Sequence, residues 1–308
     1  MNSLKKFIPP ILCLLAAMIW GFAFTAQKAA SELSAFTVGG VRNVFATLFL
    51  LSVIPLFDKM RAKASGEPKR KIPLTKDEFC GGVVCGVILT LASAFQQTGL
   101  QDGTDAGKAA FITALYVVLV PIISLTLGKK TAVSVWISVC IAAVGFYFLC
   151  IKGDFTLTPS DALVLICALI FALHIIAIDH FSPSSDGIRL SCVQFFVSFV
   201  LNSILALIFE LPINLSALEG ALPSLLYLGV CSSGIAYTLQ ILAQKDINPA
   251  ACSVILSLES VFGVIGGALF IGERMTGREY LGCAIVFFAV ILSQIDFSAL
   301  KAYFSKSR

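Results

Sequence analysis

Charged residues are scarce in this chain of 308 residues, because Asp, Glu, Lys and Arg together make up only 13% of it. Soluble proteins average about 25%, and a soluble chain of this length needs a far more polar surface. Hydrophobic residues make up 58%. The shortage of charge argues against an ordinary soluble fold and predicts an integral membrane protein of many spans.

Motifs that carry enzymatic or metal chemistry are missing as well. The ten cysteines form no CxxC pair and no Cys/His cluster, so we interpret them as small packing residues and not as a disulfide frame or a metal site. No GxxxxGK[ST] loop is present, which excludes intrinsic coupling to ATP, and neither HExxH nor GxSxG occurs. We therefore expect no enzyme activity, no cofactor, no metal site and no nucleic-acid partner.

Long apolar runs fill most of the chain. Ten of them have the length of about 17–25 residues with which a helix crosses the hydrocarbon core of a bilayer. The predicted spans are 8–29, 35–57, 79–100, 107–127, 131–151, 161–180, 187–209, 221–243, 249–271 and 277–296. The connections are short, apart from the basic segment 58–78. The sequence thus predicts an all-α integral membrane protein with ten transmembrane helices.

Basic residues are distributed unequally between the two sides of these spans. With the N-terminus in the cytoplasm, 16 of the 22 Lys and Arg residues fall on the cytoplasmic side and 5 on the outer side, and Arg42 lies inside a span. Positive residues accumulate in cytoplasmic loops. We therefore expect a multi-pass protein of the cell (cytoplasmic) membrane with both termini and the segment 58–78 in the cytoplasm.

Polar residues recur at fixed spacing in the two halves of the chain. Gln96 and Gln240 lie 144 residues apart, and the segments FQQTGLQD and LQILAQKD around them overlay at this offset. In the first part of each half the offset is 152 residues, so that Arg42 aligns with Gln194. The longer polar connection in the first half accounts for the difference.

We interpret this pattern as two five-span repeats, 1–151 and 152–308. An odd number of spans per repeat forces the second repeat to lie inverted in the membrane. Inverted repeats are typical of secondary transporters, whose sites lie near the membrane midplane between the repeats. The repeat pattern therefore favours a transporter.

One acidic residue, Glu259, lies near the middle of the apolar run 249–271. A charge at that depth costs on the order of 2.5–3.5 kcal/mol even on insertion scales. The acid could be neutralised by protonation or by a structural partner. We favour the other interpretation, in which its carboxyl lines a substrate or proton pathway.

The segment around this acid, ILSLESVFGVIGGALFIGERMT, resembles the signature of the EamA-type transporters of the drug/metabolite transporter superfamily. Leu258-Glu259 and Gly272-Glu273-Arg274 match that signature, whereas Ser260 stands where the family has proline, which leaves a kink there open. The segments AAMIWGFAF, VRNVFA and LYVVLVP resemble further parts of the family. The resemblance implies a carrier that moves an amino acid, metabolite or drug-like solute by alternating access, with export as the favoured direction.

Polar and aromatic residues within the predicted spans are the candidates for a substrate pathway. They are Trp20, Phe24, Gln96, Tyr116, His174, Tyr237, Gln240 and Glu259. The two residues Trp20 and Phe24 share a helical face and would form a stacking wall, unless they are packed or lipid-facing aromatics. The glutamines and tyrosines could contact substrate or join helices. His174 could carry a proton or be a hydrogen-bonded structural residue, and we interpret Arg42 as a structural residue in an ion pair.

A channel and a membrane-embedded enzyme or structural protein are the alternatives to a carrier. A channel should show a ring of like polar residues, and an enzyme should show a catalytic cluster. The sequence contains neither. We therefore expect a carrier whose partners are a small solute and the lipid bilayer, with the substrate, the coupling ion and the oligomeric state left open.

Overall fold

The computed structural model describes residues 7–65, 73–150, 158–271 and 276–295. The helices in these residues are α2 (Ile8–Ala29), α3 (Ala35–Ser65), α4 (Lys76–Gln101), α5 (Ala106–Ala114), α6 (Tyr116–Thr126), α7 (Val133–Cys150), α8 (Pro159–Phe181), α9 (Gly187–Phe209), α10 (Leu215–Tyr227), α11 (Thr238–Ala243), α12 (Pro249–Leu256), α13 (Glu259–Gly266) and α14 (Gly277–Ser293). A short 3₁₀ turn, η1 (Ser182–Ser184), follows α8. Two π-helical stretches, η2 (Leu228–Tyr237) and η3 (Gly267–Ile271), follow α10 and α13.

Eight helical segments in the described part of the chain are long and apolar enough to cross a membrane. Four of them are composite, namely Lys108–Thr126, Pro159–Ser184, Leu215–Ala243 and Pro249–Leu269. A further apolar helix, Val133–Phe148, is shorter. The prediction of an all-helical protein with many apolar, membrane-crossing helices is confirmed.

Two helices extend beyond the predicted apolar spans. α3 continues to Ser65, so the first part of the predicted connection 58–78 is helical. Its last turns are rich in Lys, Arg and Ala, which favour helix without being apolar, and Asp58 forms an ion pair of 2.7 Å with Arg189 at the start of α9. α10 begins at Leu215 and not at 221, because the side chain of Asn214 accepts a hydrogen bond from Ala217 N and caps the helix.

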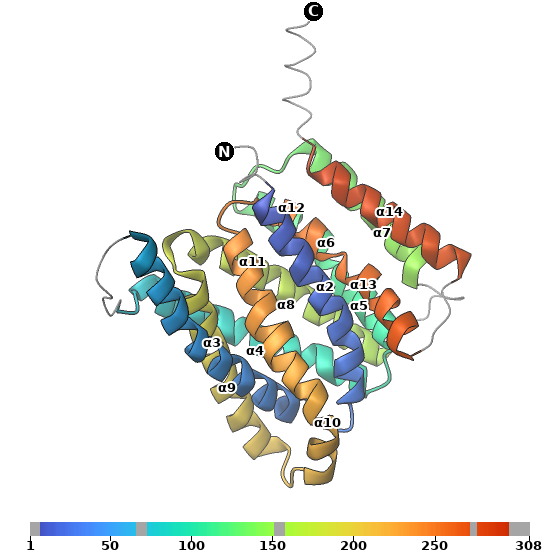
Figure 1. The fold of residues 1–308 in the computed structure, drawn as a ribbon. Helices are drawn as coiled ribbons and strands as arrows, with labels where there is room; N and C mark the ends of the chain where they lie inside the picture. Colours follow the sequence, from blue (N-terminus) through green and yellow to red (C-terminus); the bar gives the residue numbers. More distant parts are fainter. Residues whose placement is uncertain (1–6, 66–72, 151–157, 272–275, 296–308) are drawn as a thin grey trace, which may run out of the picture.

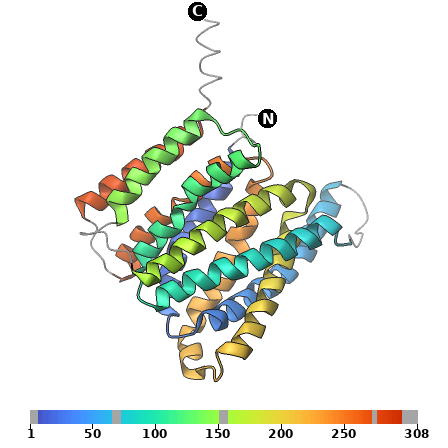
Figure 2. The same cartoon turned by 180° about the vertical axis from the view of Figure 1, so that it is seen from behind.

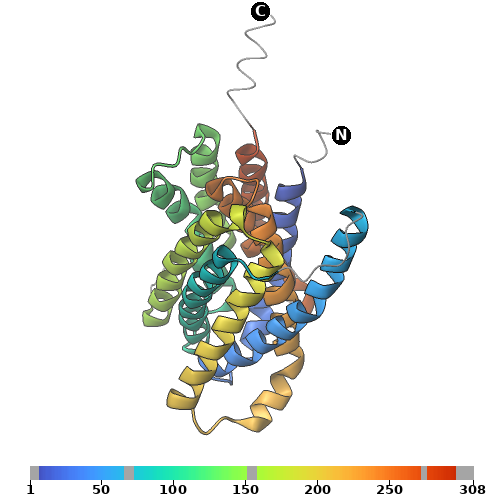
Figure 3. The ribbon, with the colours of Figure 1, turned by 90° about the vertical axis from the view of Figure 1, so that its left-hand side faces the viewer.

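The helices pack as an inclined bundle (Figure 1). α7 and α14 lie side by side at one edge, and α3 and α9 pack together at the other. Figure 2 shows from behind how α4 and α8 run next to each other, and Figure 3 views the α3–α9 edge directly. α2 lies inside the bundle, where it contacts η2, α11 and α13.

Two of the membrane-spanning segments are broken near their middle. α5 ends and α6 begins around Leu115, and α12 ends and α13 begins around Ser257 and Leu258. At both breaks the backbone makes a tighter 3₁₀ bond, from Leu115 N to Ile112 O at 3.2 Å and from Leu258 N to Ile255 O at 3.1 Å. The α-helical hydrogen bonding is therefore interrupted just before Ser260, although no proline stands there.

The same type of helix crossing occurs twice at glycine residues. A Cβ added to Gly86 of α4 would lie 2.7 Å from a backbone oxygen of α9, and one added to Gly229 of η2 would lie 2.6 Å from a backbone oxygen of α3. The neighbours are Gln194 and Val197 for the first glycine, and Arg42 and Phe45 for the second. Gln194 lies 152 residues after Arg42, and Val197 lies 152 residues after Phe45, which is the offset seen in the sequence. A glycine is required at each crossing because no side chain fits there.

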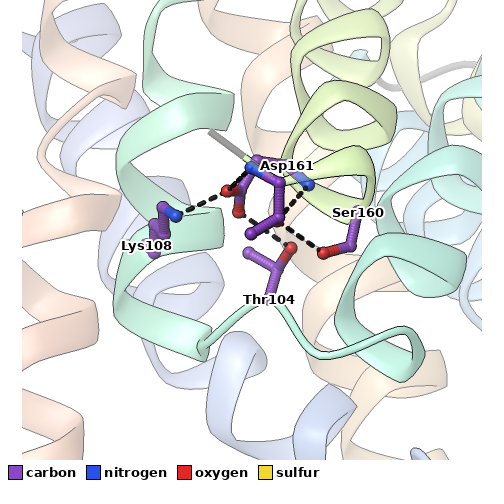
Figure 4. A network of polar contacts seen from close by, with 5 residues as sticks. Thr104, Lys108, Ser160 and Asp161 are labelled. Carbon is purple, nitrogen blue, oxygen red and sulfur yellow. Dashed lines mark hydrogen bonds and ion pairs between the residues drawn. The ribbon is translucent and has the colours of Figure 1, made fainter. Parts of the chain in front are cut away.

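A polar network ties the connection between α4 and α5 to the start of α8 (Figure 4). Asp161 closes a capping box with Thr158, and its carboxylate also accepts a hydrogen bond from Thr104 and pairs with Lys108 of α5. The pattern Thr-x-x-Asp is visible in the sequence as a helix start, but the contacts to Thr104 and Lys108 depend on the fold. The network fixes α5 against α8 at one end of the bundle.

Candidate functional site

A pocket lies at the centre of the bundle, where the two broken segments meet α2, α4, α8 and η2. It contains about 530 Å³ of space not filled by atoms, part of which is open to solvent. All the residues singled out from the sequence line it, namely Trp20, Phe24, Arg42, Gln96, Tyr116, His174, Tyr237, Gln240 and Glu259. These residues come from eight helical elements, so the fold brings together groups that are distant in the sequence.

Several lining residues were not among the candidates. Gln27, Thr113, Phe171 and Ser232 also face the pocket. The position of Gln27 could have been inferred, because it lies three residues after Phe24 on the same helical face. Ser232 carries no such signal, since its place depends on a contact with Arg42 across 190 residues.

Tyr237 is the centre of an aromatic cluster. Its ring lies edge-on to Trp20 with 4.6 Å between the centroids, and also contacts His174 at 5.6 Å and Phe195 at 5.5 Å. The indole Nε1 of Trp20 donates to the carbonyl of Ser232 at 3.0 Å. Trp20 and Tyr237 thus pack against each other at the pocket, and Phe24 lines it as well.

A hydrogen-bonded glutamine lies near the C-terminal end of α2. Gln96 Oε1 accepts from Gln27 Nε2 at 3.2 Å, and Gln96 Nε2 donates to Thr113 Oγ1 at 3.0 Å. The interaction connects α2, α4 and α5 across one end of the pocket. Both the helix-joining and the substrate-contact interpretations of Gln96 fit this position.

A second glutamine lies toward the opposite end of α2. Gln240 Nε2 donates to Gln244 Oε1 at 2.8 Å, and Gln244 Nε2 donates to the carbonyl of Ile175 at 2.9 Å. Ala243, three residues on, shares a buried cluster with Cys13 of the first turns of α2. Gln240 Oε1 has no hydrogen-bond partner among the described residues. The two glutamines therefore differ, because only Gln96 has both its amide groups engaged.

The acid of the pocket lies at the first residue of α13. Glu259 is only 5% exposed, and its Oε1 has no hydrogen-bond partner within the described chain. The same holds for the hydroxyl of Tyr116, the first residue of α6. The two groups are near enough to interact electrostatically. Both helix breaks thus present a polar group to the pocket, Tyr116 at one break and Glu259 at the other.

The cation of the pocket, Arg42, has hydroxyl partners. Its Nε donates to Ser233 Oγ at 3.1 Å, and one terminal nitrogen donates to Ser232 Oγ at 3.2 Å. No acid of the described residues forms an ion pair with it. The structural ion pair that we expected from the sequence therefore has no partner in this part of the chain.

His174 is held by a polar residue behind the pocket. Its Nε2 lies 2.9 Å from Gln194 Oε1, and since an amide oxygen only accepts, this ring nitrogen carries the hydrogen. Gln194 is the residue that matches Arg42 in the repeat pattern. The hydrogen bond orients the imidazole edge toward Tyr237.

The serines next to Glu259 face helices and not the pocket. The hydroxyls of Ser253 and Ser257 donate to carbonyls of their own helical segment, and Ser260 Oγ donates to Ala110 O of α5 at 3.0 Å. In the described residues no group of three or more His, Cys, Asp and Glu side chains could hold a metal ion. What the pocket offers is one cation, one acid, amide groups and aromatic rings, a set suited to reversible binding of a small solute.

Comparison with known sequences identifies the family. The profile of the EamA-like transporter family matches residues 8–151 and again residues 158–294. The chain belongs to this family. The resemblance drawn from Glu259 and its neighbours is thereby confirmed.

Similar proteins share the length of this EamA-family chain. An uncharacterized transporter of Archaeoglobus fulgidus is 31% identical over 296 residues, which cover 94% of this chain and 87% of the relative. The uncharacterized transporter YoaV of Bacillus subtilis is 20% identical over 294 residues, which cover 92% of this chain and 96% of YoaV. A crystal structure with 14% identity has the same fold, with a TM-score of 0.71 over 92% of this chain and 96% of that one. The EamA-family protein is thus a multi-pass membrane transporter.

Proposed function

We propose that this protein is a secondary carrier that moves a small metabolite across the cytoplasmic membrane by alternating access, with export as the net direction. The observation that carries the proposal is the central pocket, which is lined by Arg42, Glu259 and aromatic rings. Broken helices that present polar groups near the midplane are a recurring way to build a transport site. The family and the transporter-named relatives support the same reading.

The proposal includes ten spans arranged as two inverted repeats, residues 1–151 and 152–308. Three findings support it. The family profile matches the chain twice, the glycine crossings at Gly86 and Gly229 have equivalent neighbours, and the breaks fall at Leu115 and Leu258. A carrier of this type changes access when one repeat moves against the other around a fixed site.

Flux measurements test the transport activity itself. The purified protein is reconstituted into liposomes, loaded with an unlabelled amino acid or other small metabolite, and given a labelled trace outside. A carrier produces saturable flux and counterflow, in which the internal solute accelerates entry of the label. Flux that rises linearly with concentration and shows no counterflow would indicate a channel and would overturn the proposal.

The two glutamines provide a test of alternating access. Gln96 and Gln240 lie toward opposite ends of the pocket, and we expect each to be accessible in the state in which the other is closed. Single cysteines at the two positions, in a cysteine-free background, should change their labelling rates in opposite directions when a bound solute is added. A change in the same direction at both positions would contradict the proposed exchange between the two ends.

The orientation of the chain is tested by labelling from outside. Since basic residues concentrate on one side of the proposed spans, we expect both termini and position 65 to lie in the cytoplasm and position 216 to lie outside. In intact cells, an impermeant thiol reagent should label Ser216→Cys but not Ser65→Cys. The reverse pattern would show that the topology is inverted, and labelling after permeabilisation serves as the control for reactivity.

A further inference from the structure

The guanidinium of Arg42 is a positive charge buried inside the pocket. Its removal from water is costly in free energy. The residue is only 8% exposed and lines the cavity. Its two hydrogen-bond partners in the described chain, Ser232 and Ser233, are neutral hydroxyls. They use two of the five N–H donors of a guanidinium, which leaves donors that can face the cavity.

A counter-ion for this charge is missing from the described part of the protein. The ion pairs among the described residues are Lys108–Asp161, Lys129–Asp179 and Arg189–Asp58, and none of them includes Arg42. Glu259 lines the same pocket without forming an ion pair with it, and Tyr237 interacts with both charged groups. A buried charge without a partner is strongly unfavourable, and serine hydroxyls orient the guanidinium without neutralising it.

We propose that the missing counter-ion is an anionic oxygen group of the transported solute, of the carboxylate class, and that Arg42 selects for it. The inference rests on the proposed transport function and names the chemistry that the site recognises. A guanidinium offers parallel N–H donors that match the two oxygens of a carboxylate. Ser232 and Ser233 hold Arg42 in place, and the rings of Trp20 and Tyr237 form the wall for the rest of the solute.

Binding of matched acid and amide pairs tests the charge selection. Thermal unfolding of the purified protein is measured with benzoate and benzamide, phenylalanine and phenylalaninamide, and leucine and leucinamide, since a ligand of the folded state raises apparent stability. We expect stabilisation by an acid and none by its amide. Arg42→Gln should weaken acid binding roughly 10- to 100-fold, the range for a hydrogen bond to a charged group. Equal stabilisation by acid and amide, or by chloride or inorganic phosphate alone, would overturn the proposal.

The stability of the ligand-free protein gives a second test that needs no known solute. If Arg42 awaits a counter-ion from the solute, its replacement by Gln removes an unfavourable buried charge, and the unfolding temperature should stay level or rise. If Arg42 is a structural residue, the unfolding temperature should fall by several degrees, which would refute the inference. Ser233→Ala is the matched variant, because it removes one hydrogen bond and keeps the charge, so the difference between acid and amide should persist.

The two proposals fail in distinguishable ways. An acid that binds through Arg42 but shows no counterflow in liposomes would refute the transport function and leave the inference standing. A neutral solute that is transported with counterflow, at a rate unchanged in Arg42→Gln, would refute the inference and leave the transport function standing.

Discussion

Glu259→Gln is expected to remove the dependence of transport on pH between pH 6 and 8 and to lower flux by at least about tenfold. Glutamine keeps the shape of the side chain but has no proton to exchange. Glu259 lies at a helix break, lines the pocket and has an oxygen without a bonded partner in the described chain. Loss of a hydrogen bond to a charged group corresponds to roughly 10- to 100-fold in binding. Flux in liposomes at several pH values, normalised to reconstituted protein, measures both effects.

Two comparisons make the result specific. Glu219→Gln removes an exposed acid of α10 and should leave flux and its pH dependence unchanged. Glu259→Asp retains a titratable group and should keep part of the pH dependence. Wild-type flux with unchanged pH dependence in a well-folded Glu259→Gln would show that the acid is only packed and protonated. Loss of pH dependence alone would assign it to proton coupling, and loss of solute binding as well would place it in the binding site.

The spans could be predicted because the bilayer requires long apolar helices, and a polar residue within such a run is conspicuous. The same argument identified the pocket residues, since a buried acid, glutamine or tyrosine needs a partner or a cavity. All nine residues named from the sequence line the pocket. Sequence alone did not show which of them contact each other. The central position of Tyr237 and the serine partners of Arg42 arise from contacts between residues about 190–220 positions apart.

Other features left no usable pattern in the sequence. No proline stands at the breaks at Leu115 and Ser257–Leu258, where one tighter 3₁₀ turn interrupts each helix. The π-helical stretch η2 lies in an ordinary apolar run, where Trp20 binds the carbonyl of Ser232. The ends of α3 and α10 extend past the apolar runs, because capping and helix propensity, and not hydropathy, decide where a helix stops outside the hydrocarbon.

Gly21→Ala is expected to lower stability by roughly 1–3 kcal/mol, the usual cost of overpacking, and to reduce flux sharply. α2 crosses α13 at this residue. A Cβ on Gly21 would lie 2.4 Å from Phe262 Cβ, 2.7 Å from Glu259 O and 2.8 Å from Gly263 N. Two of these three atoms belong to the backbone, so α13 has to shift as a whole. Because Glu259 begins α13, the shift also moves its carboxyl within the pocket.

Gly263→Ala is the matched control, on the other side of the same crossing. Its Cβ would meet its nearest neighbours, Gly21 O and Ala110 Cβ, at 3.6 and 3.7 Å, which is ordinary contact. Alanine also favours the helix by about 0.5–1 kcal/mol over glycine, so the unfolding temperature should stay level or rise. Thermal unfolding and flux, measured for both variants, test this difference between Gly21→Ala and Gly263→Ala. Equal losses in the two would show that the crossing tolerates no methyl group on either side, and normal behaviour of Gly21→Ala would show that α2 and α13 are not packed this closely in the membrane.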